Sequence, residues 1–372
     1  MVNTTNRDPL QALSGRRCLV TGHTGFKGSW LTLCLQRLGA QVFGYALEPP
    51  TIPSLFYAAR IIDRCAGHTI GDIRDKEALR MAVEIARPEV VFHLAAQSLV
   101  GHGLAHPNET FDVNLMGTVT LLDALRNSPD LKALVVITTD KCYRPNGGEY
   151  AFRESDPLGG EDPYSASKAC TEIAVEAYRA SYFRESAASI TTVRAGNVIG
   201  GGDWATHRLV PDMIRFLSGI DAHFSVRNPD AIRPWQHVLD PLYGYMQLAS
   251  QMLEGNPKAE GAFNFGPDLL SHVAVRNLVT SVFSHWGRTD ANTWLEDAAA
   301  SFKETQILRL ASHKVNSTIG WVPRWDLKQM IRRTSDWYQS HAQGMDATLL
   351  CEADIAAYFA THPAACEFKT AA

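Results

Sequence analysis

Four short apolar runs stand out in the first half of the chain. They cover residues 18–21, 41–47, 90–94 and 134–138, and they are mostly continuous and rich in β-branched residues. A continuous apolar run of this length is typical of a strand that is buried on both faces. The runs therefore predict a parallel sheet with helices on its two faces.

Apolar residues at helical spacing fill the intervals between these runs. Leu31, Leu35 and Leu38 recur at helical spacing, and Gly39 favours the end of a helix there. A second stripe comprises Leu115, Val119, Leu122 and Leu125. The repeated order of strand and helix predicts an α/β fold with a doubly wound parallel sheet of the Rossmann type.

The pattern changes after residue 198, where glycine, proline and tryptophan become more frequent. We predict that residues 1–198 contain the parallel sheet. Residues 199–345 would form a smaller C-terminal domain that closes over the carboxyl edge of the sheet. Residues 346–372 have a helical pattern and form a tail to which the sequence assigns no role.

Composition narrows the function classes. The 372 residues carry a formal net charge of −4, which gives general nucleic-acid binding no electrostatic support. The seven cysteines are scattered without a CxxC pair, so we expect neither a disulfide framework nor a metal site, and a reducing cytoplasm. We also expect no secretory signal and no membrane span, because no apolar run is long enough.

The first predicted strand runs directly into a glycine loop. Gly22, Gly25 and Gly28 have the spacing GxxGxxG before a helix, where a sharp turn and a close approach by a pyrophosphate favour residues without Cβ. A plain tight turn is the alternative. Glu48, after the second strand, could hold a ribose or be an exposed loop acid. No arginine directly follows that strand, which favours NAD over NADP.

A tyrosine and a lysine lie four residues apart at the start of another predicted helix. Asp162 can cap this helix, Pro163 suits its first position, and Tyr164 and Lys168 then share one face. A lysine ammonium there would lower the tyrosine pKa and make the phenol a base for an alcohol proton. A surface pair on a helix is the alternative interpretation.

The predicted strand at 134–138 is followed by polar residues. Thr139 could hydrogen-bond a sugar hydroxyl, and Asp140 and Lys141 are adjacent ionisable groups. The carboxyl ends of strands are where such folds place their chemistry. A solvated pair in a loop is the alternative for Asp140 and Lys141.

These motifs resemble the extended short-chain dehydrogenases, and more narrowly the nucleotide-sugar 4,6-dehydratases of the CDP-glucose branch. The resemblance covers about residues 16–340. The matching segments include TGHTGFKGSW at 21–30, GDIRD at 71–75, FHLAAQ at 92–97, TTDKCY at 138–143, DPYSASK at 162–168, VRAGNVIGGGDW at 193–204 and RNPDAIRPWQHVLDPL at 227–242.

The resemblance implies roles for residues in these segments. NAD would be held by Gly22, Gly25, Phe26, Gly28, Asp72, Ile73, Ala95, Ala96, Gln97, Tyr164 and Lys168. The nucleotide sugar would be bound by Asn197, Arg208 and Arg233, and the chemistry would be carried out by Thr139, Asp140, Lys141, Tyr164 and Lys168. The first domain would thus bind NAD and the second mainly the nucleotide sugar.

The implied reaction is an internal redox dehydration. Tyr164 takes the C4 hydroxyl proton, a base removes the C5 proton, and Asp140 protonates the leaving C6 oxygen. The product is a 4-keto-6-deoxy sugar for deoxysugar and surface-polysaccharide biosynthesis, and NAD is regenerated. Lys141 stands where many dehydratases have a glutamate base, so it would be the C5 base or would stabilise the enolate.

Two segments depart from the branch, which leaves the accepted sugar open. Residues 98–104 lack its arginine and Ser-Tyr pair, and residues 144–150 lack its tryptophan-bearing loop. The rival functions are a nucleotide-sugar epimerase or decarboxylase, a 4,6-dehydratase of another nucleotide hexose, and a non-catalytic NAD sensor. The resemblance also implies a homodimer or homotetramer that pairs through helices flanking the sheet, with the helix from Tyr164 as one candidate.

Overall fold

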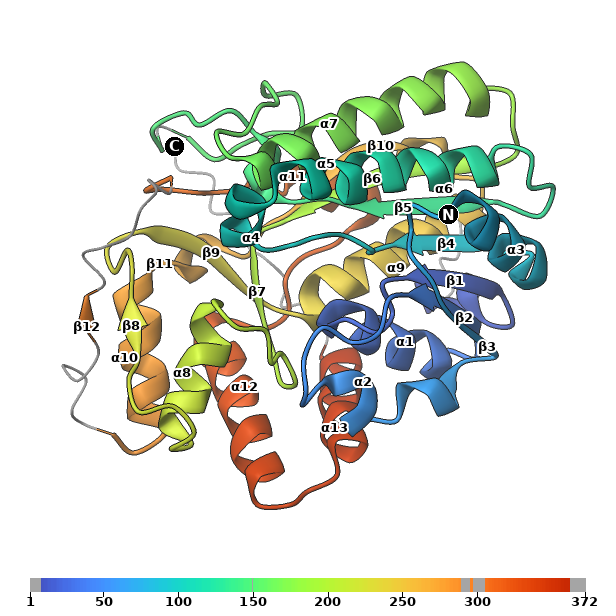
Figure 1. The fold of residues 1–372 in the computed structure, drawn as a ribbon. Helices are drawn as coiled ribbons and strands as arrows, with labels where there is room; N and C mark the ends of the chain where they lie inside the picture. Colours follow the sequence, from blue (N-terminus) through green and yellow to red (C-terminus); the bar gives the residue numbers. More distant parts are fainter. Residues whose placement is uncertain (1–7, 149, 289–294, 297–304, 362–372) are drawn as a thin grey trace, which may run out of the picture.

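A seven-stranded parallel sheet forms the centre of the computed structural model, which describes residues 8–148, 150–288, 295–296 and 305–361 (Figure 1). The strand order is β10-β6-β5-β4-β1-β2-β3, so the chain winds outward in both directions from β1 and confirms the predicted fold class. The strands are β1 (Arg17–Thr21), β2 (Gln41–Ala46), β3 (Gly67–Ile70), β4 (Val90–His93), β5 (Ala133–Ile137), β6 (Ser189–Ala195) and β10 (Gly261–Phe265).

The four predicted strands are β1, β2, β4 and β5, with ends displaced by one residue from the prediction. Every residue of β4 and β5 is buried, as their continuous apolar runs require. The apolar pattern did not reveal β6, because Thr191, Thr192 and Arg194 interrupt it and are nevertheless buried. Strand β6 is therefore a buried strand whose polar side chains have partners inside the protein.

Helices cover both faces of this sheet, above and below it in Figure 1. Two separate apolar clusters fill the two faces. One face carries α3 (Lys76–Ala86), α4 (Val100–Ala105), α5 (Pro107–Phe111), α6 (Gly117–Leu125) and α7 (Pro163–Tyr178), and the other carries α1 (Phe26–Arg37), α2 (Leu55–Ala58), α9 (Leu239–Leu253) and α13 (Ala347–Ala360). The predicted second stripe begins at Leu115 in a π-helical turn, Asp112–Met116, which leads directly into α6.

The second half of the chain builds a smaller region and also completes the large sheet. A three-stranded sheet joins β7 (Asn197–Ile199), β9 (Ile232–His237) and β11 (His272–Ala274), and β8 (Ser225–Val226) pairs with β12 (Leu295–Glu296). Around them lie α8 (Leu209–Leu217), α10 (Val275–His285), α11 (His313–Ile319) and α12 (Leu327–Ala342). Strand β10 pairs with β6, so the second half is not confined to the smaller region. The division at residue 198 stays a prediction.

The C-terminal helix α13 packs on the first half of the chain. Its buried residues Cys351, Ile355 and Tyr358 belong to the same apolar cluster as α1 and α9. The Thr348 hydroxyl donates to the Ala59 carbonyl at 3.1 Å, which ties α13 to α2. The helical part of the predicted tail therefore closes one face of the large sheet. None of the helices in the described ranges could cross a membrane.

Candidate active site

The glycine loop lies between β1 and α1 and brings three segments of backbone close together. Gly22 has φ +75°, and a Cβ there would lie 2.7 Å from the Ala95 nitrogen after β4. A Cβ at Gly28 would lie 2.1 Å from the Gly22 carbonyl oxygen. Gly25 caps α1 and would bring a Cβ no closer than 3.4 Å to its neighbours, which leaves room over the helix N-terminus. The loop can thus offer its backbone N–H groups to a phosphate.

Lys27 is a second feature of this loop that the motif analysis did not single out. It is the second residue of α1 and is partly buried. Burial, together with the charge of Arg208, lowers the pKa of Lys27 to about 8, while Asp140 and Asp203 act in the opposite direction. Its ammonium therefore lies near the acid that follows β5. The signal in the sequence was a lysine between the second and third glycines.

Glu48, which follows β2, is the predicted candidate for holding the ribose of NAD. The Glu48 carboxylate accepts a hydrogen bond from the Tyr57 hydroxyl at 2.9 Å, so it already has a partner in the protein. The buried His23 ring fills the space below Gly44 and lies 2.7 Å from the His68 ring nitrogen. A ribose role for Glu48 stays a prediction.

Asp72 and Ile73 lie at the end of β3, at the edge of the same region. Arg74 forms an ion pair with Asp72 at 2.6 Å, and the Tyr45 hydroxyl donates to the Asp72 carbonyl at 2.8 Å. Ile73 is buried against Gly117 at the start of α6. These contacts fix the segment that the resemblance assigns to the adenine, and the role itself stays a prediction.

The segment Ala95–Ala96–Gln97 follows β4 and is fixed by Asn114. The Gln97 N–H donates to the Asn114 side-chain oxygen at 2.8 Å, and the Asn114 amide donates to the Gln97 carbonyl at 3.0 Å and to the Ser167 hydroxyl at 2.9 Å. Asn114 thereby joins this loop to α7, which carries Tyr164 and Lys168. No local pattern singles out Asn114, because its partners are distant along the chain.

Tyr164 and Lys168 lie on the buried face of α7. Asp162 caps the helix by accepting from the Ser165 N–H at 3.0 Å, and Lys168 donates to the Ile137 carbonyl at 3.1 Å. Burial raises the pKa of Tyr164 to about 12, although the Thr139 hydroxyl, which hydrogen-bonds the phenol, lowers it. The predicted lowering by Lys168 is therefore wrong as a net effect in the protein alone, because burial has the largest influence on this pKa and the nearby charge that opposes it belongs to Arg208. Burial lowers the pKa of Lys168 itself to about 8.

Asp140 is the acid of this region, and one of its oxygens has no partner among the described residues. Its side chain is buried, Oδ1 accepts from the Thr139 hydroxyl at 3.1 Å, and Oδ2 is without a hydrogen bond. Burial raises the pKa of Asp140, against the opposing charges of Lys141, Arg233 and Lys27. This direction of shift favours the protonated form, which is the form that a general acid needs.

Lys141 lines a cavity of about 280 Å³ beside this acid. Arg233 and Tyr143 also line the cavity, and so do Val100, Leu104 and Pro145. The last three come from the segments 98–104 and 144–150, which depart from the branch that the chain resembles. The structure thus places both altered segments in the wall of one cavity next to Lys141.

The predicted substrate residues lie on the smaller sheet and at α8. Asn197 is on β7 and Arg233 is on the neighbouring strand β9, where it donates to the Ile232 carbonyl at 3.0 Å. Arg208 caps α8, forms an ion pair with Asp203 at 3.0 Å and donates to the Ser98 hydroxyl at 2.7 Å. Arg208 therefore bridges the smaller region and the loop after β4. Whether the three residues bind substrate stays a prediction.

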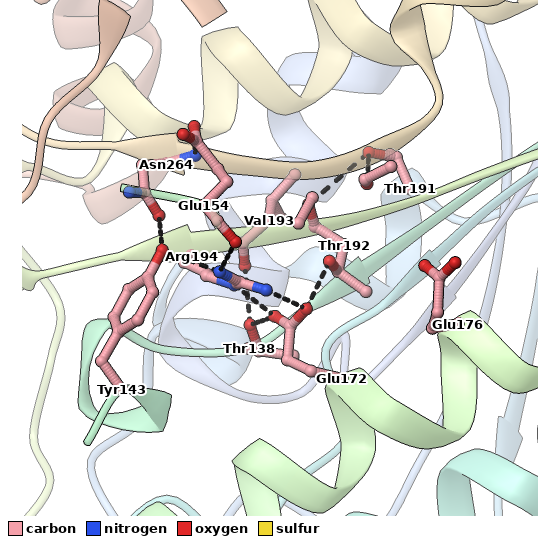
Figure 2. A network of polar contacts seen from close by, with 12 residues as sticks. Thr138, Tyr143, Glu154, Glu172, Glu176, Thr191, Thr192, Val193, Arg194 and Asn264 are labelled. Atoms are coloured by element: carbon pink, nitrogen blue, oxygen red, sulfur yellow. Dashed lines mark hydrogen bonds and ion pairs between the residues drawn. The ribbon is translucent and has the colours of Figure 1, made fainter. Parts of the chain in front are cut away.

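A buried ion pair lies behind this site, between Glu172 on α7 and Arg194 on β6, at 2.8 Å (Figure 2). Burial alone would raise the pKa of Glu172, but hydrogen bonds from Arg194, Thr138 and Thr192 outweigh it and lower that pKa. Neither residue was predicted. The available signal was an acid four residues after Lys168, on the helix face that also carries Tyr164.

Comparisons with known proteins agree with this arrangement. The family model described as GDP-mannose 4,6 dehydratase matches residues 19–334. CDP-glucose 4,6-dehydratase of Salmonella typhimurium is 43% identical over 349 residues, which is 92% of this chain and 96% of the relative.

Solved structures share the fold. The dTDP-glucose 4,6-dehydratase from Bacillus anthracis in complex with NAD has a TM-score of 0.72 at 23% identity and covers 88% of this chain and 97% of its own. Epimerase Mth375 from Methanothermobacter thermautotrophicus has a TM-score of 0.78 at 19% identity over 95% of this chain and 99% of its own. At these identities the structures show the fold, whereas the sequence matches show descent. The chain belongs to the GDP-mannose 4,6-dehydratase family, within the extended short-chain dehydrogenases.

Proposed function

We propose that this protein is an NAD-dependent nucleotide-sugar 4,6-dehydratase, and that its substrate is CDP-glucose. The reaction would release water and form CDP-4-keto-6-deoxyglucose. The substrate follows from the relative of Salmonella typhimurium, which is named for CDP-glucose and matches this chain over nearly its whole length. The reaction type rests on the site itself.

The observation that carries the proposal is the buried position of Asp140, with one carboxyl oxygen that has no partner among the described residues. Elimination of water across C5 and C6 needs an acid that protonates the departing C6 oxygen. Asp140 is buried, its pKa is raised, and its Oδ2 has no partner among the described residues. An epimerase or decarboxylase needs no acid for a departing hydroxyl at this position, so the geometry favours the dehydratase.

The glycine loop fits the diphosphate of NAD. Its backbone is exposed above Gly25, while side chains are excluded at Gly22 and Gly28, where a Cβ would clash with backbone. Lys27 adds positive charge on the side that faces Asp140, and Lys168 lies close enough to Lys27 for the two charges to interact. When bound, NAD would supply the acceptor and donor of hydride, and so would be needed in catalytic amounts.

Tyr164 would remove the proton of the C4 hydroxyl. With a pKa of about 12 in the protein alone, the phenol is a poor base at neutral pH. A nearby positive charge stabilises the phenolate and lowers this pKa. With a pKa of about 8, Lys168 remains mostly protonated at pH 7 and supplies such a charge. Thr139 would orient the phenol through its hydrogen bond.

Lys141 is our proposed base for the C5 proton, a role that requires its neutral amine, since Lys141 lines the cavity beside Asp140. Asn197, Arg208 and Arg233 would bind the nucleotide diphosphate, for which an arginine fork is well suited. Arg208 would have to share its guanidinium between the ligand and its present partners Asp203 and Ser98.

We further propose a homodimer or homotetramer in the cytoplasm. The support for pairing is that large apolar side chains are exposed on and beside α6 and α7, namely Met116 just before α6, Ile173 on α7 and Tyr182 just after α7. The support for a reducing compartment is that the six cysteines in the described ranges are all free thiols. Cys366 lies outside the described residues.

The test is incubation of the purified protein with NAD and a panel of CDP-glucose, dTDP-glucose, UDP-glucose and GDP-mannose. We expect CDP-glucose to yield a 4-keto-6-deoxy product, which absorbs near-ultraviolet light in alkali. Turnover of another sugar in its place would refute the CDP-glucose assignment, and epimerised sugar would refute the dehydratase. Tyr164→Phe should lower turnover by about 10²-fold or more, whereas the exposed Tyr182→Phe should match the wild type.

A further inference from the structure

We propose that the buried Glu172–Arg194 pair is a positioning device for the acid turn, defined as Thr139, Asp140 and Lys141. The pair contacts the residues that flank this turn on both sides and holds them against α7. The inference rests on the proposed function, because it assigns a purpose to the position of the proposed acid and base.

The first anchor precedes the acid turn. The Thr138 hydroxyl donates to Glu172 Oε1, and the Thr138 N–H donates to the Val193 carbonyl at 2.9 Å (Figure 2). The end of β5 is thereby tied to both α7 and β6. Since Glu172 lies one turn beyond Lys168 on α7, this anchor also sets the distance between the acid turn and the Tyr164–Lys168 face.

The second anchor follows the acid turn. Arg194 Nη1 donates to the Tyr143 hydroxyl at 2.7 Å, and that hydroxyl donates to the Asn264 side-chain oxygen on β10, also at 2.7 Å (Figure 2). The Tyr143 ring stacks on Phe152 with centroids 4.6 Å apart. The chain is therefore fixed again two residues after Lys141.

The ion pair joins the two anchors into one unit. Arg194 Nε and Nη2 donate to the two Glu172 oxygens at 2.9 and 2.8 Å, and the Thr192 hydroxyl donates to Oε2 at 2.6 Å. The two side chains are 4% and 3% exposed. A buried pair with this many bonds has little freedom to move, and its net gain in stability over apolar residues is usually small. The contribution of this ion pair is therefore to fix the positions of the two anchors rather than to add stability.

This arrangement explains how the position of Asp140 can be fixed without a hydrogen-bond donor on its free oxygen, Oδ2. A donor placed directly on Asp140 Oδ2 would lower its pKa and would compete with the substrate oxygen. Anchors at Thr138 and Tyr143 hold the backbone instead and leave Oδ2 free of partners among the described residues. Displacing a reacting group by about 1 Å can cost on the order of 100-fold in rate. The anchors are therefore expected to affect turnover.

The test compares two threonines that donate to the same carboxylate. Thr138→Val and Thr192→Val each remove one hydroxyl donor to Glu172, but only Thr138 adjoins the acid turn. We expect Thr138→Val to lower kcat with NAD and CDP-glucose by about tenfold or more with KM within about twofold, and Thr192→Val to leave both near wild type. Tyr143→Phe, which keeps the ring stack, should behave like Thr138→Val.

Hydrogen exchange of the peptide that contains residues 138–143 gives a second measurement that needs no turnover. We expect faster exchange there in Thr138→Val and Tyr143→Phe than in Thr192→Val. Equal kcat and equal exchange in the two threonine variants would overturn the positioning role, even if their melting temperatures fall. A wild-type protein that forms no 4-keto product would overturn the proposed function, and the exchange comparison would still decide whether the pair fixes the turn.

Discussion

Two buried carboxylates lie close to the same strand end and differ in almost every other respect. Glu172 accepts hydrogen bonds from Arg194, Thr138 and Thr192, and its pKa is lowered. Asp140 accepts one from Thr139 at Oδ1, leaves Oδ2 without a partner among the described residues, and has a raised pKa. Burial is common to both, so the partners decide the difference. One acid is built to stay charged and hold structure, the other to carry a proton.

The largest effect is expected when the proposed acid, Asp140, is replaced by a residue that cannot donate a proton to the substrate. Asp140→Asn keeps the shape but cannot donate a proton to the C6 oxygen, so we expect turnover of CDP-glucose to fall by about 10²- to 10⁴-fold. The fall corresponds to about 3–5 kcal/mol in the activation free energy. The near-ultraviolet absorbance of the 4-keto-6-deoxy product in alkali measures this turnover. Asp63→Asn, at an exposed position, is the control and should be unchanged. A loss under tenfold would contradict the role of Asp140.

The second largest effect is expected for the charge of Glu172. Glu172→Gln leaves Arg194 buried without its counterion, which costs about 3–5 kcal/mol in the free energy of unfolding. Urea unfolding measures this quantity. Glu176→Gln, one turn further along α7 (Figure 2), is a matched control, because the ion pair of Glu176 with Arg179 is at the surface. The control should lose about 1 kcal/mol or less. Equal losses in the two variants would show that the buried pair is not special.

The same contrast shows what the sequence could predict. The strands β1, β4 and β5 follow from continuous apolar runs, and the polar residues after β5 were expected at the carboxyl edge of the sheet. Asp140 could be singled out in this way because its position depends on one strand and the turn after it. Local patterns therefore pointed to Asp140 as a candidate, and the family resemblance supplied its proposed role as the acid.

Glu172 could not be interpreted in the same way. Its partner Arg194 is 22 residues away, and the next member, Asn264, is another 70 residues along the chain. They meet only because β6 lies between β5 and β10, an order that no local pattern contains. The polar residues of β6 that complete the network also interrupt its apolar pattern, so the sequence did not predict β6 as a buried strand. The network and strand β6 were missed for one physical reason, which is that the burial of a polar side chain can be understood only when its partners are known.

The smallest effect is expected in the pH dependence of stability, where the two acids have opposite signs. Asp140 keeps its proton in the folded state above its ordinary pKa of 3.8, so its ionisation makes folding less favourable as the pH rises through the folded pKa. Glu172 contributes stability above its ordinary pKa of 4.5, and that contribution is lost as the pH falls through its lowered folded pKa. The charges of Lys141, Arg233 and Lys27 near Asp140 limit the first effect without reversing it.

Asp140→Asn isolates the first of these effects. At pH 8 the variant lacks the buried carboxylate and should exceed the wild type in free energy of unfolding by about 1 kcal/mol. The difference should shrink as the pH is lowered toward 4, because the folded wild-type protein takes up the proton on Asp140 before the unfolded chain does. Urea unfolding of both proteins between pH 4 and pH 8 measures it. A difference that stays constant or grows toward pH 4 would mean that Asp140 is held as a carboxylate, and the contrast with Glu172 would disappear.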